Sequence, residues 1–202
     1  MDDFFHPTFF PAWVRWLSLV WLAVWIPSYA HYWGWLNFLH VCDIGVFLTC
    51  LGFVRGSALL LSSQAVSSLV PDLLWCLDAG WRWFAGRQLT GGTEYMWDAG
   101  IPLWVRLLSL FHFVFPALLL LALRRTGYDR RGWILQCWIA AVLLALSRFM
   151  GPAQNLNYAF ADPLFHRAFG PAPIHLAVIF AGLAGIIYWP THLLLARFFP
   201  SR

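Results

Sequence analysis

The sequence predicts an all-α fold, a polytopic membrane helix bundle with about six transmembrane helices, and three observations predict it. Hydrophobic residues make up 61% of the 202 residues, charged residues only 11%, and the mean hydropathy is +0.67. Several apolar runs approach the ~20 residues that a helix needs to cross a bilayer. No internal repeat or long polar loop marks a second unit, so residues 1–202 are predicted to form a single transmembrane domain.

Six apolar segments are predicted to span the membrane: residues 13–30, 35–54, 57–80, 103–123, 132–150 and 174–197. Every cationic side chain apart from histidine is an arginine, and six spans place eight arginines on one side and five on the other. Four of the eight lie in the link 124–131. The positive-inside rule then puts both termini in the cytoplasm of a multi-pass protein of the inner (cytoplasmic) membrane. These arginines are interpreted as topology anchors, and no nucleic-acid partner is predicted.

The first span is bounded by aromatic residues, Trp13 at its start and Trp33 just beyond its end. Tryptophan and tyrosine also gather near the ends of the other spans, as expected where amphipathic rings lie at the level of the lipid headgroups. The four cysteines all fall within predicted spans, so no disulfide framework is predicted.

The second span, residues 35–54, reads W-L-N-F-L-H-V-C-D-I-G-V-F-L-T-C-L-G-F-V. Desolvation in hydrocarbon penalises a charged carboxylate, so Asp43 and its neighbour Cys42 are expected to face the bundle interior and to mark a functional site. At about 100° per residue, His40 and Asn37 point away from that face. The inward face is predicted to hold Cys42, Asp43, Val46, Thr49, Cys50 and Phe53.

The third span carries a polar stripe at intervals of four residues, formed by Gln64, Ser68, Asp72 and Cys76. Pro71 lies within this span and frees the backbone carbonyl of Ser67 from the helical ladder. The stripe has two interpretations, hydrogen-bonding contacts between helices or part of a functional site. The carboxyl group of Asp72 favours the second.

In the fourth span Ser109, His112 and Pro116 share one face, and the proline releases the carbonyl of His112. At 1.5 Å per residue, His112 lies ~13 Å below the outer surface, Asp72 ~12 Å and Cys42 ~10 Å. Three spans therefore place an imidazole, a carboxyl and a thiol in one layer of the outer half. A hydrogen-bonded histidine that serves only packing is the alternative for His112.

The fifth span has the most ordinary sequence of the six. The link after it is half apolar, and Asn155, Asn157 and Tyr158 either dip into the bundle mouth as a re-entrant cover or lie on the membrane surface. In the last span, His175 is predicted near the outer surface and His192 near the cytoplasmic end.

Five short motifs occur in register along the chain: Cys42-Asp43-Ile44, Pro71-Asp72-Leu73, Phe111-His112, Asn157-Tyr158 and Gly170-Pro171-Ala172-Pro173. In this order they resemble the YwaF-type bacterial integral membrane protein family. That family is similar in fold to a eukaryotic transmembrane acyltransferase and, more distantly, to membrane hydrolases of lipid esters. The resemblance implies a membrane cysteine and histidine as the reacting pair, which by position are Cys42 and His112. The sequence departs from the family at residues 37–41, which replace the usual Pro-Leu run.

Acyl transfer needs a nucleophile, a base and donors for the developing oxyanion. The catalytic candidates are Cys42 as nucleophile, His112 as base, Asp72 or Asp43 as the group that orients the imidazole, and Asn157 or Asn155 as oxyanion donor. The predicted function is therefore a lipid acyltransferase or lipid-ester hydrolase acting on membrane lipids. No cofactor or metal is predicted, because no H-E-x-x-H, C-x-x-C or paired histidines lie on one span.

Three other functions stay open. The chain could be a non-enzymatic scaffold or accessory subunit, with a homo-oligomer or a membrane protein partner. A proton-coupled transporter is disfavoured because the sequence has no inverted repeat. Haem or metal binding would need His40, His112 and His175 to converge from three spans.

Overall fold

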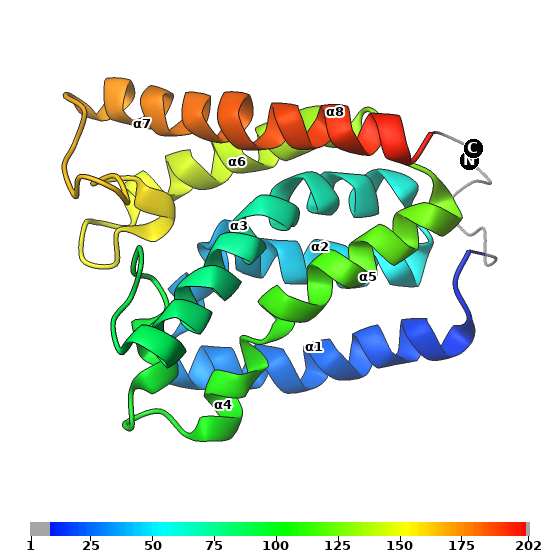
Figure 1. Ribbon diagram of the computed structural model, residues 1–202, viewed down its shortest axis with the longest axis horizontal. Helices are drawn as coiled ribbons and strands as arrows, with labels where there is room; N and C mark the ends of the chain where they lie inside the picture. Colours follow the sequence, from blue (N-terminus) through cyan, green and yellow to red (C-terminus); the bar gives the residue numbers. More distant parts are fainter. Residues whose placement is uncertain (1–8, 201–202) are drawn as a thin grey trace.

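The structure is a computed structural model that describes residues 9–200, within which all regular secondary structure is helical (Figure 1). Six helical segments run in alternating directions along the long axis. They are α1 (Ala12–Tyr32), α2 (Val41–Arg55) with the 3-10 turn η2 (Trp35–Leu39) before it, α3 (Ala58–Ala85), α4 (Leu103–Leu108) continued by α5 (Phe111–Thr126), α6 (Gly132–Phe149), and α7 (Ala172–Ala181) continued through the π-helix Gly182–Tyr188 into α8 (Trp189–Phe198).

The two ends of the bundle differ in their connections (Figure 1). One end, here called the loop end, holds the links 33–40, 86–102 and 150–171. The other, the terminal end, holds the short links 56–57 and 127–131 together with the first and last described residues. Seven described arginines lie toward the terminal end, and Asp129 is the acidic residue described beside them.

Four helices are long and apolar enough to cross a membrane: Ala58–Ala85, Leu103–Thr126, Gly132–Phe149 and Ala172–Phe198. Four of the six predicted spans are therefore confirmed as membrane-capable helices. α1 has the length, at 21 residues, but it contains four tryptophans and Arg15. α2 has 15 residues, which at 1.5 Å each cover about 22 Å of a hydrocarbon core ~30 Å thick.

Helix α3 is the central element and contacts α2, α5, α6 and α8. Its first half is buried on every side from Leu61 to Ser68, which explains why a run of small hydroxyl residues occurs there. Gly132 of α6 packs directly on this run, because a Cβ at that position would lie 2.8 Å from the backbone nitrogen of Ser63. Gly56, in the left-handed conformation (φ 64°), ends α2 and turns the chain into α3.

Three predicted spans are continuous in the sequence but irregular in the structure. The second breaks at His40, whose extended backbone (φ −60°, ψ 139°) separates η2 from α2. The fourth breaks at Ser109 and Leu110, between α4 and α5. The last contains the π-helix just before Pro190; the wider turn accommodates a ring that would otherwise clash with the carbonyl four residues earlier.

Candidate functional site

A buried acid and a buried histidine meet between α3 and α5 in the half of the bundle nearest the loop end. The Nδ1 atom of His112 lies 2.7 Å from Oδ1 of Asp72, and the two residues are 7% and 3% exposed. The imidazole ring stacks on Trp75 with ring centroids 4.8 Å apart and contacts Phe111 on the same helix. The predicted layer therefore contains a real contact between its carboxyl and its imidazole.

Local features of α5 hold His112 in place. Pro116 cannot donate to the backbone carbonyl of His112, and the Cys76 thiol donates to that carbonyl instead, with Sγ 3.6 Å from the oxygen. At the break between α4 and α5, the Ser109 and Tyr29 hydroxyls lie 2.6 Å apart. Asp72 and Cys76, the third and fourth residues of the predicted stripe, therefore both form a hydrogen bond with His112.

The pairing fixes which nitrogen of the imidazole can do chemistry. Because Nδ1 faces the carboxyl group, the free nitrogen is Nε2, which makes no hydrogen bond within residues 9–200. A carboxylate at Nδ1 stabilises the imidazolium that forms when Nε2 accepts a proton. The geometry therefore suits a general base whose proton-accepting atom is Nε2.

A second acid, Asp43, forms its own cluster at the start of α2. Asn37 donates from Nδ2 to Oδ2 of Asp43 at 2.6 Å, and the Cys42 thiol donates to Oδ1 at 3.9 Å. The prediction that Asn37 points away from Asp43 is wrong, because the break at His40 folds η2 back over the first turn of α2. Of the predicted inward face, Asp43, Val46, Thr49, Cys50 and Phe53 are buried, and Cys42 is half-buried.

Cys42 and His112 are not joined directly. No hydrogen bond links them in the described part of the chain, since the thiol donates to Asp43 and the imidazole pairs with Asp72. A thiolate at Cys42 would also be repelled by the adjacent carboxylate of Asp43. The thiol would have to rotate away from Asp43 before His112 could take its proton.

Asn157 clamps the loop end together. Its Oδ1 accepts from the backbone N–H of Val41 at 2.9 Å, while its Nδ2 donates to the carbonyl of Leu39 and to the Ser147 hydroxyl, each at 2.8 Å. Its backbone is in the left-handed region (φ 52°), which asparagine tolerates better than most residues. Both amide hydrogens are used, so a role as oxyanion donor would need one of these bonds to open.

The link after α6 is a folded cover with a buried and an exposed side. His175 donates from Nε2 to the carbonyl of Tyr158 at 2.9 Å, and the Arg148 guanidinium lies 4.0 Å from the centre of the Phe160 ring. The side chains of Leu164 and Phe165 are 70% and 63% exposed. Leu156 and Asn157 therefore pack on the bundle mouth, while Tyr158 is 45% exposed and the tip of the same link presents apolar side chains outward.

Asp162 organises the exposed tip of this cover. Its carboxylate accepts from the backbone N–H groups of Leu164, Phe165 and Arg167. Burial by itself disfavours the charge, but these N–H donors outweigh it and lower the pKa of the Asp162 carboxyl below its ordinary value.

Sequence reasoning missed a polar network in the middle of the bundle. Gln136 of α6 is fully buried; its Nε2 donates to the Ser67 hydroxyl at 2.9 Å, and its Oε1 accepts from Nε2 of Gln64 at 3.5 Å. Tyr188, in the π-helix, lies 3.4 Å from the same amide nitrogen. The sequence signal for this network is Gln136 itself, a glutamine inside the apolar run of the fifth predicted span, which is otherwise ordinary in sequence.

The three histidines considered for haem or metal do not converge. His112 pairs with Asp72, and His175 bonds to two backbone groups of the cover. Within residues 9–200 no group of three or more His, Cys, Asp or Glu side chains is placed to hold a metal ion.

Comparisons with known proteins return no match to a family model, to a curated protein or to a solved structure.

Proposed function

We propose that all six helical segments span the inner (cytoplasmic) membrane as one domain, with both termini in the cytoplasm. The alternating directions of the segments support this, as does the gathering of arginines toward the terminal end. α2 reaches spanning length if η2 is counted with it, and α1 is of spanning length already.

Within this bundle, the proposed activity is acyl transfer from, or hydrolysis of, a membrane lipid ester, with His112 as the base. The observation that carries the proposal is the buried pair of His112 and Asp72, with the second imidazole nitrogen unbonded within the described chain. Burying an ionisable pair in a membrane bundle is costly, and such pairs are read first as functional. Asp72 would orient the imidazole and stabilise its protonated form.

Cys42 is the proposed nucleophile. Its proton passes to Nε2 of His112, the sulfur attacks the ester carbonyl carbon, and the C–O bond breaks as the leaving alcohol takes the proton back from His112. The thioester is then attacked by an acceptor hydroxyl or by water, which gives its proton to His112; the C–S bond breaks and the thiol is restored. Membership of the YwaF-type family, which would support this pair, remains a prediction.

The second candidate is a scaffold or accessory subunit, and one observation favours it. Asp43, Asn157 and Gln136 all have hydrogen-bond partners inside the protein, as polar groups used only for helix packing would. Under this alternative the pair of His112 and Asp72 would contribute to assembly alone.

The deciding experiment is lipidomics of a strain that lacks the chain, complemented by the wild type, His112→Ala, Cys42→Ala or His192→Ala. His192 is the matched control, because it is equally buried and also hydrogen-bonded through Nδ1, but lies at the terminal end. The enzyme proposal expects normal membrane levels of each variant, with lipid turnover lost in the first two and kept in the third. Unchanged turnover in His112→Ala would refute the enzyme proposal. If turnover were lost in Cys42→Ala but kept in His112→Ala, His112 would not be the base that activates the cysteine.

A further inference from the structure

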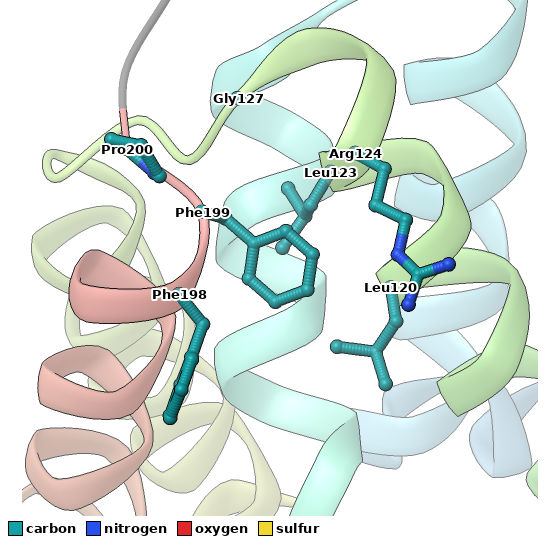
Figure 2. Close-up of a pocket in the computed structure, with 7 residues that line it drawn as sticks. All are labelled: Leu120, Leu123, Arg124, Gly127, Phe198, Phe199 and Pro200. Carbon is teal, nitrogen blue, oxygen red and sulfur yellow. The ribbon is translucent and has the colours of Figure 1, made fainter.

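A hollow at the terminal end is far from the site described above and is lined by apolar side chains and one arginine. It has a volume of about 530 Å³ and lies between the last turns of α5 and α8 (Figure 2). Leu120, Leu123 and Phe199 form its inner wall, Phe198 forms its rim, and the Arg124 side chain extends beside it. We call it the Arg124 groove.

The described residues do not balance the charge of the groove. Arg124 is exposed and forms no hydrogen bond or ion pair within residues 9–200. Asp129, the acidic residue described near this end, already forms an ion pair with Arg131, whose Nη2 lies 2.8 Å from its carboxylate. Among residues 9–200, the groove therefore presents a cation without a counter-ion, beside further arginines of the same end.

Some of the carbonyl groups at the helix ends beside the groove already have hydrogen-bond partners. Two carbonyls there accept backbone hydrogen bonds: Leu123 from Gly127 at 2.8 Å, and Phe199 from Tyr128 at 3.0 Å. Exposed carbonyls at a helix C-terminus would repel an anion, and these two are already satisfied. The Arg124 guanidinium, near the end of α5, offsets the negative end of the helix dipole and can also bind a ligand.

The level of the groove indicates its ligand. Arg124 lies two residues before the end of the membrane-capable helix Leu103–Thr126, and Leu120 lies one turn deeper. In a membrane this places the guanidinium at headgroup level and the leucine and phenylalanine wall at the level of the first acyl carbons. A ligand that matches both is an amphiphile with an anionic head.

We propose that the Arg124 groove binds an anionic phospholipid, with the headgroup phosphate on the Arg124 guanidinium and the start of an acyl chain against Leu120 and Phe198. Arginine suits a phosphate because its planar fork donates two parallel hydrogen bonds. The inference rests on the proposed membrane topology but not on the acyl-transfer chemistry. A variant of the groove could lose lipid binding and keep turnover, and a His112 variant could do the reverse.

The test is native mass spectrometry of the purified chain in detergent with phosphatidylglycerol or phosphatidylcholine of identical acyl chains. We expect the wild type to retain phosphatidylglycerol at least about tenfold more than phosphatidylcholine, and Arg124→Gln to lose most of that preference. Arg87→Gln is the matched control, since Arg87 is also exposed but lies at the loop end, and it should keep the preference.

Two further arms make the result decisive. Arg124→Lys keeps the positive charge but lacks the planar fork of donors, so its preference for phosphatidylglycerol should lie between those of the wild type and Arg124→Gln. Phe198→Ala should weaken the binding of both lipids. Equal retention of the two lipids by the wild type overturns the proposal and needs no variant. Full displacement of phosphatidylglycerol by equimolar inorganic phosphate overturns it too, because the groove would then recognise phosphate without the lipid.

Discussion

Two buried histidines, one in each half of the molecule, are built alike and differ in one partner. His112 and His192 are 7% and 8% exposed, and each uses Nδ1 in a hydrogen bond, at 2.7 Å and 2.8 Å. Each imidazole also stacks on a tryptophan ring, Trp75 or Trp189. The partner of His112 is the Asp72 carboxyl, and the partner of His192 is the Tyr128 phenol.

That difference decides what each histidine can do. A carboxylate stabilises a protonated imidazole, so His112 can hold a proton during a reaction. Burial raises the pKa of the Tyr128 phenol above its ordinary value, with the nearby Asp129 acting in the same direction, so the phenol stays neutral. A neutral partner orients His192 but gives little support to a positive ring. Burial and stacking alone therefore do not make a buried histidine a catalytic candidate.

The largest expected effect comes from changing Asp72, the partner of His112, and the matched change is at Tyr128, the partner of His192. Asp72→Asn keeps the shape of the carboxyl group but removes the charge that supports the imidazolium, and we expect lipid turnover to fall by about 10²–10⁴-fold. Tyr128→Phe should leave turnover within about twofold and cost ~1 kcal/mol of stability. Turnover assays on membranes with matched protein levels measure both; similar losses in the two variants would mean that the halves do not differ in function.

Asn157→Ala tests how firmly the loop end is held. The change leaves Val41 N–H, the Leu39 carbonyl and the Ser147 hydroxyl without their shared partner, and we expect a loss of about 2–3 kcal/mol in the free energy of unfolding. Ser62→Ala at the terminal end removes a single acceptor for the Asp129 N–H and should cost ~1 kcal/mol. Unfolding titrations in mixed micelles would compare them, and a smaller effect for Asn157 would argue against a clamp.

Gly132→Ala tests the packing between α3 and α6. The added Cβ would meet Ser62 and the Ser63 backbone at under 3.0 Å, so the helices must separate, at a cost of about 1–3 kcal/mol. Gly185→Ala is the control, because nothing lies within 4 Å of a Cβ there, and it should change stability by less than ~0.5 kcal/mol. Equal thermal midpoints for the two variants would contradict the close approach.

The smallest effect concerns the ion pair of the half-buried Asp129 and the exposed Arg131. Hydrogen bonds from Arg131 lower the pKa of the Asp129 carboxyl, so its contribution to stability is present above the ordinary carboxyl pKa and is lost as the pH falls through the lowered value. Asp129→Asn should therefore lower the thermal midpoint slightly at pH 7 and not at all once the wild-type carboxyl is protonated. A difference in thermal midpoint between the wild type and Asp129→Asn that grows toward low pH would contradict this prediction.

Much of the fold was predictable because apolar length and helical periodicity are local properties. The six predicted segments coincide with helical segments to within a few residues, and four of them are confirmed as membrane-capable. The inward face of the second segment and the common level of Asp72 and His112 also follow from spacing along a helix. The breaks at His40 and Ser109 were not predictable in this way, because no proline or glycine marks them.

The candidate site was predictable only in part. Periodicity fixes how far down a helix and on which side a residue lies, but not which residue of another helix stands opposite. This is why Cys42 and His112, predicted as a pair, each have a different acid as partner. It is also why Gln136 was passed over, since a single amide in an apolar run shows its importance only when Ser67 and Gln64 face it.

The sequence by itself determined that the chain is helical, apolar enough for a membrane, and supplied with two acids and a histidine inside its helices, because hydrophobicity and helical spacing act over neighbouring residues. The tertiary structure decided that Asp72 and not Asp43 pairs with His112, and that the ends of α5 and α8 enclose a groove around Arg124. Those outcomes depend on how helices distant in the sequence cross and approach, and packing against α3 sets that geometry.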